Sequence, residues 1–332
     1  MDSRSALRAA LGGPLPRPDP TFPGYGLAIL TAIITAVAFI SAKPVLDYLD
    51  PLSFSISQFG IASVLSFAIL AGTGGRRSLT RLTGGQWTFL VVISFLFLGA
   101  VYTMWIGLSR LPATAAALLN RLEVLMTVLL GMALLGDRFR RRELWGAGVT
   151  LVGVVVLRYQ APPTFSAGFW MMVLSSTLFG ITEVLVKTRA HAIPPRVFVF
   201  LRNLFVCLLF AVAALWRAAM EDGSAWIDMV DWAGVRRGLP LIATTALVGP
   251  VFARTAYMYS LRRLAVSRVA LIQQSQPVFV ALFSAFLLHA LPSRREWTGG
   301  LLIIAGCLFL VQWRARGTQG VRNESSGPAI QR

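Results

Sequence analysis

Two long apolar stretches of the chain repeat one another, and this repeat decides the fold. Residues 110–158 read RLPATAAALLNRLEVLMTVLLGMALLGDRFRRRELWGAGVTLVGVVVLR, and residues 263–311 read RLAVSRVALIQQSQPVFVALFSAFLLHALPSRREWTGGLLIIAGCLFLV. A shift of 153 positions superposes identical residues, among them Leu111 and Leu264, Arg141 and Arg294, Glu143 and Glu296, Gly146 and Gly299, and Gly153 and Gly306. Each stretch holds two apolar runs separated by a basic turn, which predicts two membrane helices joined by a short loop.

The part of the chain that precedes each stretch is repeated as well. A shift of 144 positions places Lys43 on Lys187 and Pro51 on Pro195. The two shifts differ by 9 positions because the second half has a longer loop near 217–237. The sequence therefore predicts two related halves flanked by tails, with boundaries at 1–23, 24–158, 166–313 and 314–332.

The composition excludes most soluble proteins. Hydrophobic residues make up 56% of the 332 residues and charged residues 14%, with a mean hydropathy of +0.68. Soluble domains are about 45–50% apolar and about 25% charged, so a soluble core could not bury this excess. The composition argues against a soluble enzyme, a disordered chain and a disulfide scaffold. It predicts an all-α, polytopic membrane protein.

Ten segments are apolar enough to cross a bilayer, for which a helix needs about 20 residues. Five lie in each half, and an odd number makes the second half enter the membrane in the opposite orientation. Inverted repeats of this kind are typical of secondary transporters. The expected spans are residues 24–42, 52–71, 87–108, 113–135, 143–158, 166–187, 195–216, 239–260, 265–288 and 296–313.

The basic residues predict how the chain is oriented. With the N-terminus inside, 20 of the 31 Lys and Arg residues fall in inner segments, 8 in outer segments and 3 within spans. This bias predicts cytoplasmic termini in a multi-pass protein of the inner or plasma membrane of the cell. It also accounts for the net charge of +17 without a nucleic-acid partner.

Short motifs in both halves resemble a known family. They are Leu111-Pro112-Ala113, Asn120 to Val124, Leu135-Gly136-Asp137-Arg138, Gly146 and Gly153, then Phe179-Gly180, Lys187, Pro195, Arg202, Gln276-Pro277-Val278, Gly299 and Gly306. Together they resemble the EamA repeat of the drug/metabolite transporter superfamily over most of residues 24–313. The resemblance implies ten transmembrane helices in two inverted five-helix repeats, and an exporter. The copies differ, because Gln58 stands where the second half has Arg202, and Val124 where it has Pro277.

Polar residues at matched depth in two expected spans form the main candidate for a substrate site. Asn120 and Glu123 are three apart and share a helix face. The repeat places Gln273 and Gln276 at the equivalent positions. We expect these side chains to bind substrate near the membrane midplane. Polar contacts that hold helices together are the alternative.

Other charges at membrane depth each cost roughly 2.5–3.5 kcal/mol on insertion scales, so they should face a cavity or one another. Arg254 follows Gly249-Pro250, which should kink its helix, and it is a candidate contact for a substrate anion. Arg121 and Arg202 suit a cavity or a structural pair. Glu183 precedes Lys187 by four residues, which favours a pair within one helix over a proton-carrying role.

Aromatic residues complete the candidate site, while metal and cofactor motifs are missing from the sequence. Tyr102 and Trp105 share a face of the third span, and Tyr257 lies in the related eighth span. We expect them to line the cavity, although packing explains them equally well. The two histidines and two cysteines are isolated, so we expect no metal, no cofactor and no enzyme activity.

The favoured function is therefore a secondary transporter that exports small polar or amphipathic metabolites such as amino acids. Three arginines against two glutamates within the spans favour an anionic or zwitterionic solute. A channel or passive facilitator is the alternative, and an intramembrane enzyme a remoter one. The expected partners are a small-molecule substrate and the lipid bilayer, with the chain as a monomer or homodimer.

Overall fold

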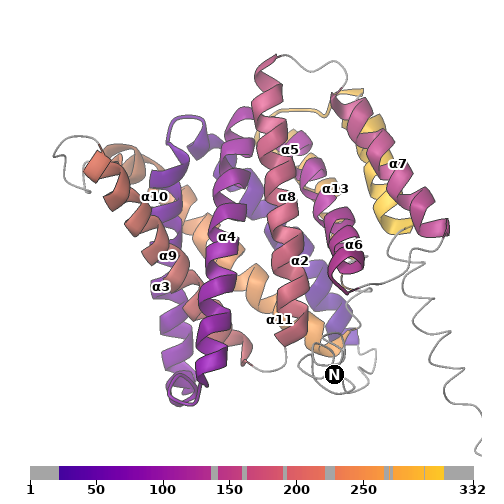
Figure 1. The fold of residues 1–332 in the computed structure, drawn as a ribbon. Helices are drawn as coiled ribbons and strands as arrows, with labels where there is room; N and C mark the ends of the chain where they lie inside the picture. Colours follow the sequence, from indigo (N-terminus) through magenta and orange to yellow (C-terminus); the bar gives the residue numbers. More distant parts are fainter. Residues whose placement is uncertain are drawn as a thin grey trace, which may run out of the picture.

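The computed structural model describes most of the chain between residues 22 and 309. The described ranges are 22–135, 141–158, 163–189, 193–220, 229–264, 269, 272–294 and 296–309. All regular secondary structure in these ranges is helical (Figure 1). The prediction of an all-α protein is therefore confirmed for the described residues.

The helices of the first half begin and end where local sequence signals place them. Asp50 caps the helix that starts at Pro51, because its carboxylate accepts hydrogen bonds from the backbone N–H groups of Leu52 and Ser53. Thr83 and Gln86 form a capping box at the start of α4. The elements are α2 (Phe22–Leu46), α3 (Pro51–Gly72), η1 (Gly75–Ser78), α4 (Gly84–Arg110), α5 (Ala113–Asn120), α6 (Leu122–Leu135) and α7 (Arg141–Arg158).

The second half follows the same order. Asp231 caps its third long helix by accepting from the backbone N–H of Gly234. A further helix, Glu296–Phe309, ends the described chain. The elements before it are α8 (Pro163–Arg189), α9 (Pro195–Met220), α10 (Trp232–Ala246), the π-helical η3 (Leu247–Ala253), α11 (Arg254–Arg263) and α13 (Gln276–Leu287).

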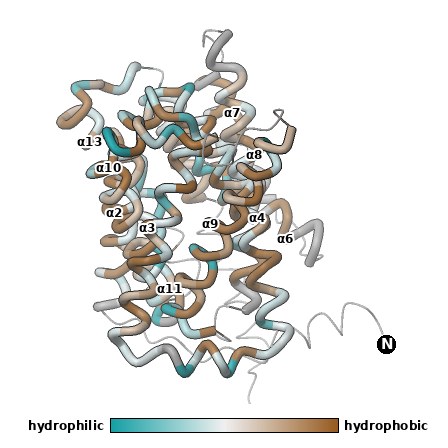
Figure 2. Tube along the Cα trace, turned by 90° about the vertical axis from the view of Figure 1, so that its left-hand side faces the viewer, coloured by the Kyte–Doolittle hydropathy of each residue, from teal (hydrophilic) through white to brown (hydrophobic). Residues whose placement is uncertain are grey.

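Six described helices are long and apolar enough to cross a membrane by length and composition. Figure 2 shows apolar residues, in brown, running along most of the helix length. Large apolar side chains such as Trp145 and Phe286 are exposed on helix surfaces, as expected for contact with lipid. The six are Gly24–Leu46, Pro51–Gly72, Gly84–Arg110, Ala167–Val186, Pro195–Met220 and Trp232–Leu261, and the shorter apolar helices are Trp145–Val156, Gln276–Leu287 and Glu296–Phe309.

Helices of one half pack against helices of the other in reciprocal pairs. In the first half, α2 contacts α10, η3 and α11, and in the second half α8 contacts α4. The related helices α3 and α9 contact each other, as do α5 and α13. Equivalent helices of the two halves therefore make equivalent packing contacts with the opposite half.

The outermost pair is held together by glycine. A Cβ atom on Gly153 of α7 would lie 2.7 Å from the backbone nitrogen of Ile303 and 2.8 Å from the carbonyl oxygen of Gly299. Gly306 approaches Thr150 and the Gly146 carbonyl in the same way. Only glycine allows backbones to come this close, so the repeated glycines of the sequence serve helix packing.

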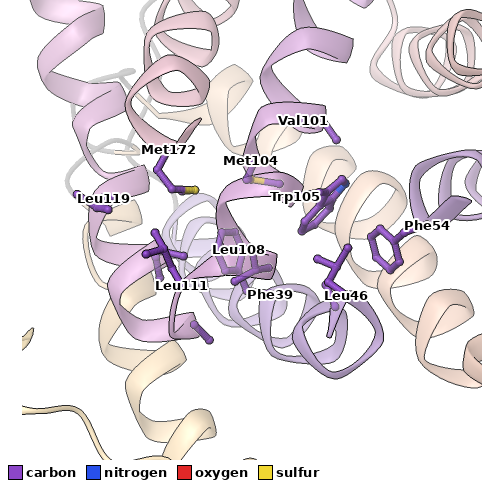
Figure 3. Packing of buried hydrophobic residues seen from close by; sticks show 14 of the residues in the cluster. Phe39, Leu46, Phe54, Val101, Met104, Trp105, Leu108, Leu111, Leu119 and Met172 are labelled. Atoms are coloured by element: carbon purple, nitrogen blue, oxygen red, sulfur yellow. The ribbon is translucent and has the colours of Figure 1, made fainter. Parts of the chain in front are cut away.

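The hydrophobic core lies where α2, α3, α4 and α8 meet (Figure 3). Trp105 of α4 is buried there, with its ring 5.1 Å from the ring of Phe54 and 6.3 Å from that of Phe39. Tyr102 packs next to it, 5.9 Å from the ring of Phe210. These aromatic pairs fix the position of α4, which lies beside the charged residues described next.

Candidate functional site

A π-helical turn at Pro250 exposes a backbone carbonyl inside the protein. The chain widens here into the π-helical segment η3, which contains Pro250. The backbone N–H of Arg254 therefore bonds to the carbonyls of Gly249 and Val251 instead of that of Pro250. The sequence predicted a kink at this proline, and the structure has a π-helical turn there.

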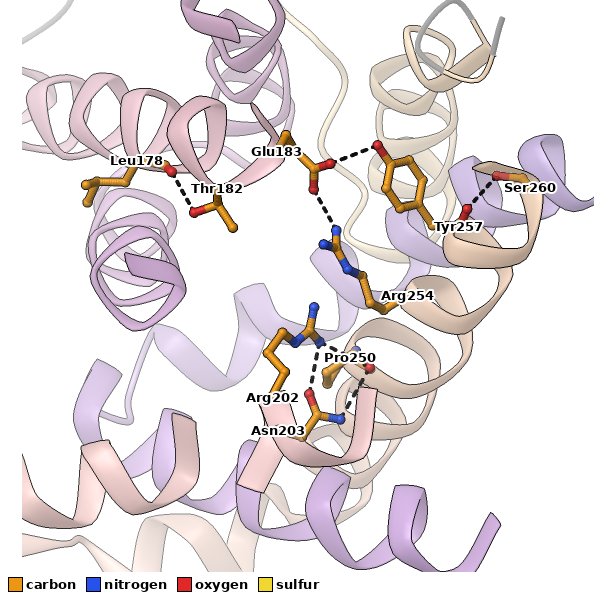
Figure 4. Close-up of polar contacts among 9 residues, drawn as sticks. All are labelled: Leu178, Thr182, Glu183, Arg202, Asn203, Pro250, Arg254, Tyr257 and Ser260. Carbon is orange, nitrogen blue, oxygen red and sulfur yellow. Dashed lines mark hydrogen bonds and ion pairs between the residues drawn. The ribbon is translucent and has the colours of Figure 1, made fainter. Parts of the chain in front are cut away.

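Arg202 and Asn203 of α9 bind the carbonyl that this turn leaves free (Figure 4). The Pro250 oxygen accepts from Arg202 Nη2 at 3.3 Å and from Asn203 Nδ2 at 3.4 Å. Arg202 Nη2 also donates to Asn203 Oδ1 at 2.9 Å. The guanidinium carbon lies 4.3 Å from the centroid of the Phe97 ring on α4. All these partners of Arg202 are uncharged.

A buried ion pair lies next to Arg202. Arg254 Nη1 donates to Glu183 Oε1 at 2.7 Å, and the Tyr257 hydroxyl donates to Glu183 Oε2 at 3.0 Å. Arg254 and Tyr257 are three apart on α11 and so present both donors to α8. The structure thus brings together four predicted residues, Glu183, Arg202, Arg254 and Tyr257, in one charged cluster.

A second polar contact joins the two halves through a broken helix in each. The expected fourth span is interrupted at Arg121, between α5 and α6, and the ninth at Gln274 and Ser275, before α13. The repeat superposes Arg121 on Gln274, so the breaks occupy equivalent positions. Tight i to i−3 bonds bridge both breaks, from Val124 to Arg121 and from Val278 to Ser275.

The side chain of Arg121 contacts the helix break of the second half. Pro277 has no N–H, so the carbonyl of Gln273 loses its helical partner. Arg121 Nη1 donates to this carbonyl at 2.9 Å, and Nη2 donates to Gln276 Oε1 at 2.6 Å. The predicted residues Gln273 and Gln276 therefore share one partner from the other half. Asn120 is buried beside this contact, and Glu123 is half-buried one turn further along.

Comparison with known proteins identifies the architecture. Residues 22–159 and 166–312 each match the EamA-like transporter family. The chain belongs to the EamA-like transporter family. It is 24% identical to an uncharacterized transporter of Archaeoglobus fulgidus over 286 residues, covering 84% of this chain and 94% of the relative. The resemblance inferred from the sequence motifs is confirmed.

Two further relatives are transporters by name. An uncharacterized transporter of Synechocystis sp. is 24% identical over 242 residues, covering 70% of this chain and 67% of the relative. The pseudopaline exporter of Pseudomonas aeruginosa is 25% identical over 150 residues, covering 44% of this chain and 46% of the exporter. A solved crystal structure superposes with a TM-score of 0.61 at 20% identity, covering 88% of this chain and 99% of that one, and so shares the fold.

Sequence reasoning missed several features of this EamA protein. It paired Glu183 with Lys187, whose side chain lies outside the described residues, and did not foresee Arg254 and Tyr257 as partners. The position of Asn203 beside Arg202 was visible in the sequence, but the Pro250 carbonyl as the partner of both was not predicted. Among the described residues, no group of three or more His, Cys, Asp or Glu side chains could hold a metal ion.

Proposed function

We propose that this EamA-type protein is a secondary transporter that exports small polar or amphipathic metabolites, such as amino acids, by alternating access. Its ten transmembrane helices would form two inverted repeats, 24–158 and 166–313, in the inner or plasma membrane with both termini cytoplasmic. It would act as a monomer or homodimer without a cofactor. A channel or passive facilitator is the alternative that the experiments below would reveal.

The observation that carries this proposal is the Arg121 contact between equivalent helix breaks. Broken helices that meet at the interface of two repeats provide free carbonyls and side chains for a solute within the membrane. The reciprocal packing of the halves supports a rocking motion around this interface. The Pseudomonas aeruginosa relative is an exporter by name, which supports export as the direction of transport.

We assign substrate binding to three groups of residues around this interface. Four residues lie at the helix breaks, two follow the π-helical turn, and two aromatic residues lie on α4 beside the hydrophobic core. The proposed substrate contacts are Asn120, Glu123, Gln273, Gln276, Arg254, Tyr102, Trp105 and Tyr257. Arg121, Glu183, Lys187 and Arg202 serve as structural or coupling charges.

Cysteine labelling tests whether the helix breaks line a site that opens to both sides. In a chain whose Cys207 and Cys307 are replaced by alanine, Glu123→Cys should react with a small polar thiol reagent added from either side of the membrane. A mixture of amino acids should slow the reaction. Ser94→Cys is the matched control, because Ser94 is buried and bonded to the Leu90 carbonyl, and it should stay unreactive. If Glu123→Cys is inert from both sides, its neighbourhood is a structural polar contact instead.

A further inference from the structure

We infer that Arg202 and Arg254 together bind the carboxylate group of the transported solute. This inference rests on the proposed function and deepens it, because it restricts the substrates to solutes that carry a carboxylate. It also changes the role of Arg202 from a structural charge to a substrate contact.

The charge balance of the cluster lacks one negative charge. Arg202 and Arg254 contribute two positive charges, and Glu183 contributes one negative charge. The charge of Glu123 also acts on Arg254 and on Arg121, and counting Glu123 and Arg121 together leaves the same excess of one positive charge. In the part of the chain that the structure describes, no carboxylate lies within ion-pair distance of Arg202. Arg202 is only 1% exposed, and the neighbouring charge of Arg254 repels it. One bound monoanion would neutralise the cluster.

The hydrogen-bond donors of the cluster lead to the same conclusion. A guanidinium group has five N–H donors and no acceptor. Arg202 Nε, Arg254 Nε and Arg254 Nη2 are buried and have no hydrogen-bond partner among the residues that the structure describes. Buried donors are nearly always paired, so three unpaired ones in two adjacent side chains indicate a missing acceptor. A carboxylate accepts two parallel bonds from a guanidinium group and fits this arrangement.

The protein holds Arg202 in place without balancing its charge. Its contacts are the Pro250 carbonyl, the Asn203 amide and the Phe97 ring. These contacts fix the side chain before any ligand binds, which lowers the entropic cost of binding. Arg254, by contrast, has a carboxylate partner in Glu183.

The surroundings favour a carboxylate over a phosphate. Phosphate groups carry about 1.5 to 2 negative charges near pH 7 and would leave the cluster with a net negative charge. The rings of Phe198 and Tyr257 lie 5.8 Å and 5.2 Å from the Arg254 guanidinium carbon and provide apolar surface beside the anion. The first half has Phe39, Gln58 and Val101 at the positions of Glu183, Arg202 and Arg254, so we expect one anion per chain.

Binding of small carboxylates to the purified full-length protein tests this inference. The probes are formate, acetate and benzoate, each compared with its neutral amide at constant ionic strength, and inorganic phosphate. We expect at least one carboxylate to raise the melting temperature in a saturable way, with one site per chain by calorimetry, while its amide has no effect. Arg202→Gln should weaken this binding at least tenfold. Glutamine is the residue that the first half already carries at this position, Gln58.

Arg237→Gln is the control for loss of one positive charge, because Arg237 is exposed on α10 with its guanidinium over the Tyr48 ring. It should bind the carboxylate as the wild type does. If Arg202→Gln does not fold, Arg202→Lys keeps the charge, and it should still prefer the carboxylate over the amide but with reduced affinity. The inference is overturned if no carboxylate binds, if amide and carboxylate act alike, if phosphate binds more tightly, or if folded Arg202 variants bind as the wild type does.

These outcomes can be distinguished from failure of the proposed function. If carboxylate binding depends on Arg202 but the protein transports nothing, the anion site stands and the proposed transport function is wrong. Saturable transport with an unchanged KM in Arg202→Gln would preserve the transporter and contradict the anion site.

Discussion

Replacement of Glu183 by glutamine should lower the free energy of unfolding by about 3–5 kcal/mol. Glu183 is the carboxylate that pairs with Arg254, and it also accepts the Tyr257 hydroxyl. Without it, Arg254 loses its ion-pair partner and the positive charges of Arg254 and Arg202 stay buried side by side, and that penalty exceeds the loss of one hydrogen bond. Unfolding of the purified variant in detergent by added SDS measures the change.

Asp47→Asn is the matched control for this change. It also converts a carboxylate into an amide, and it breaks the pair between Lys43 and Asp47, whose oxygen lies 2.6 Å from Lys43 Nζ. Asp47 is 54% exposed, so its loss should cost no more than about 1 kcal/mol. The double variant Glu183→Gln/Arg254→Gln should recover much of the stability lost in Glu183→Gln. A Glu183→Gln protein as stable as Asp47→Asn would show that the cluster is not a buried ion pair.

The contact between Arg121 and Gln276 should show strong coupling in a double-mutant cycle. Hydrogen bonds to charged groups contribute about 1.5–3 kcal/mol, and this one spans the two halves of the chain. The cycle of Arg121→Gln, Gln276→Leu and the double variant should therefore give a coupling energy of about 1.5–3 kcal/mol by the same SDS titration.

Arg110→Gln provides the reference for this cycle. Arg110 is exposed at the end of α4, so combining its replacement with Gln276→Leu should give additive effects. If the stability changes of Arg121→Gln and Gln276→Leu are additive as well, the contact between the two helix breaks does not stabilise the protein.

Much of the fold followed from the repeated sequence, because hydrophobic length and internal similarity are properties of the chain itself. The predicted span 24–42 lies within α2, and 52–71 within α3. The helix break at Arg121 could not be predicted, because its sequence contains no proline or glycine at that point. At this break Arg121 contacts the Gln273 carbonyl, and a contact between residues so far apart in the chain cannot be predicted from the local sequence.

The sequence predicted which residues form the candidate site, but not which of their side chains contact one another. Apolar segments reveal charges at membrane depth, so Glu183, Arg202 and Arg254 stood out in the sequence. The partner of each charge depends on how α8, α9 and α11 are rotated and packed. Glu183 and Arg254 are 71 positions apart, so the sequence favoured a pair between Glu183 and Lys187 within one helix. The role of Pro250 depended on a π-helical turn, which local sequence rules do not specify.

Counterflow in proteoliposomes tests the central claim of secondary transport most directly. Liposomes containing the purified protein and a high internal concentration of unlabelled amino acids are placed in a medium with trace labelled amino acids. The account predicts saturable, transient accumulation of label above its external concentration, which is absent from protein-free liposomes. Non-saturable flux that ignores the internal amino acids would indicate a channel, and the absence of any flux across a panel of carboxylate-bearing metabolites would contradict the account.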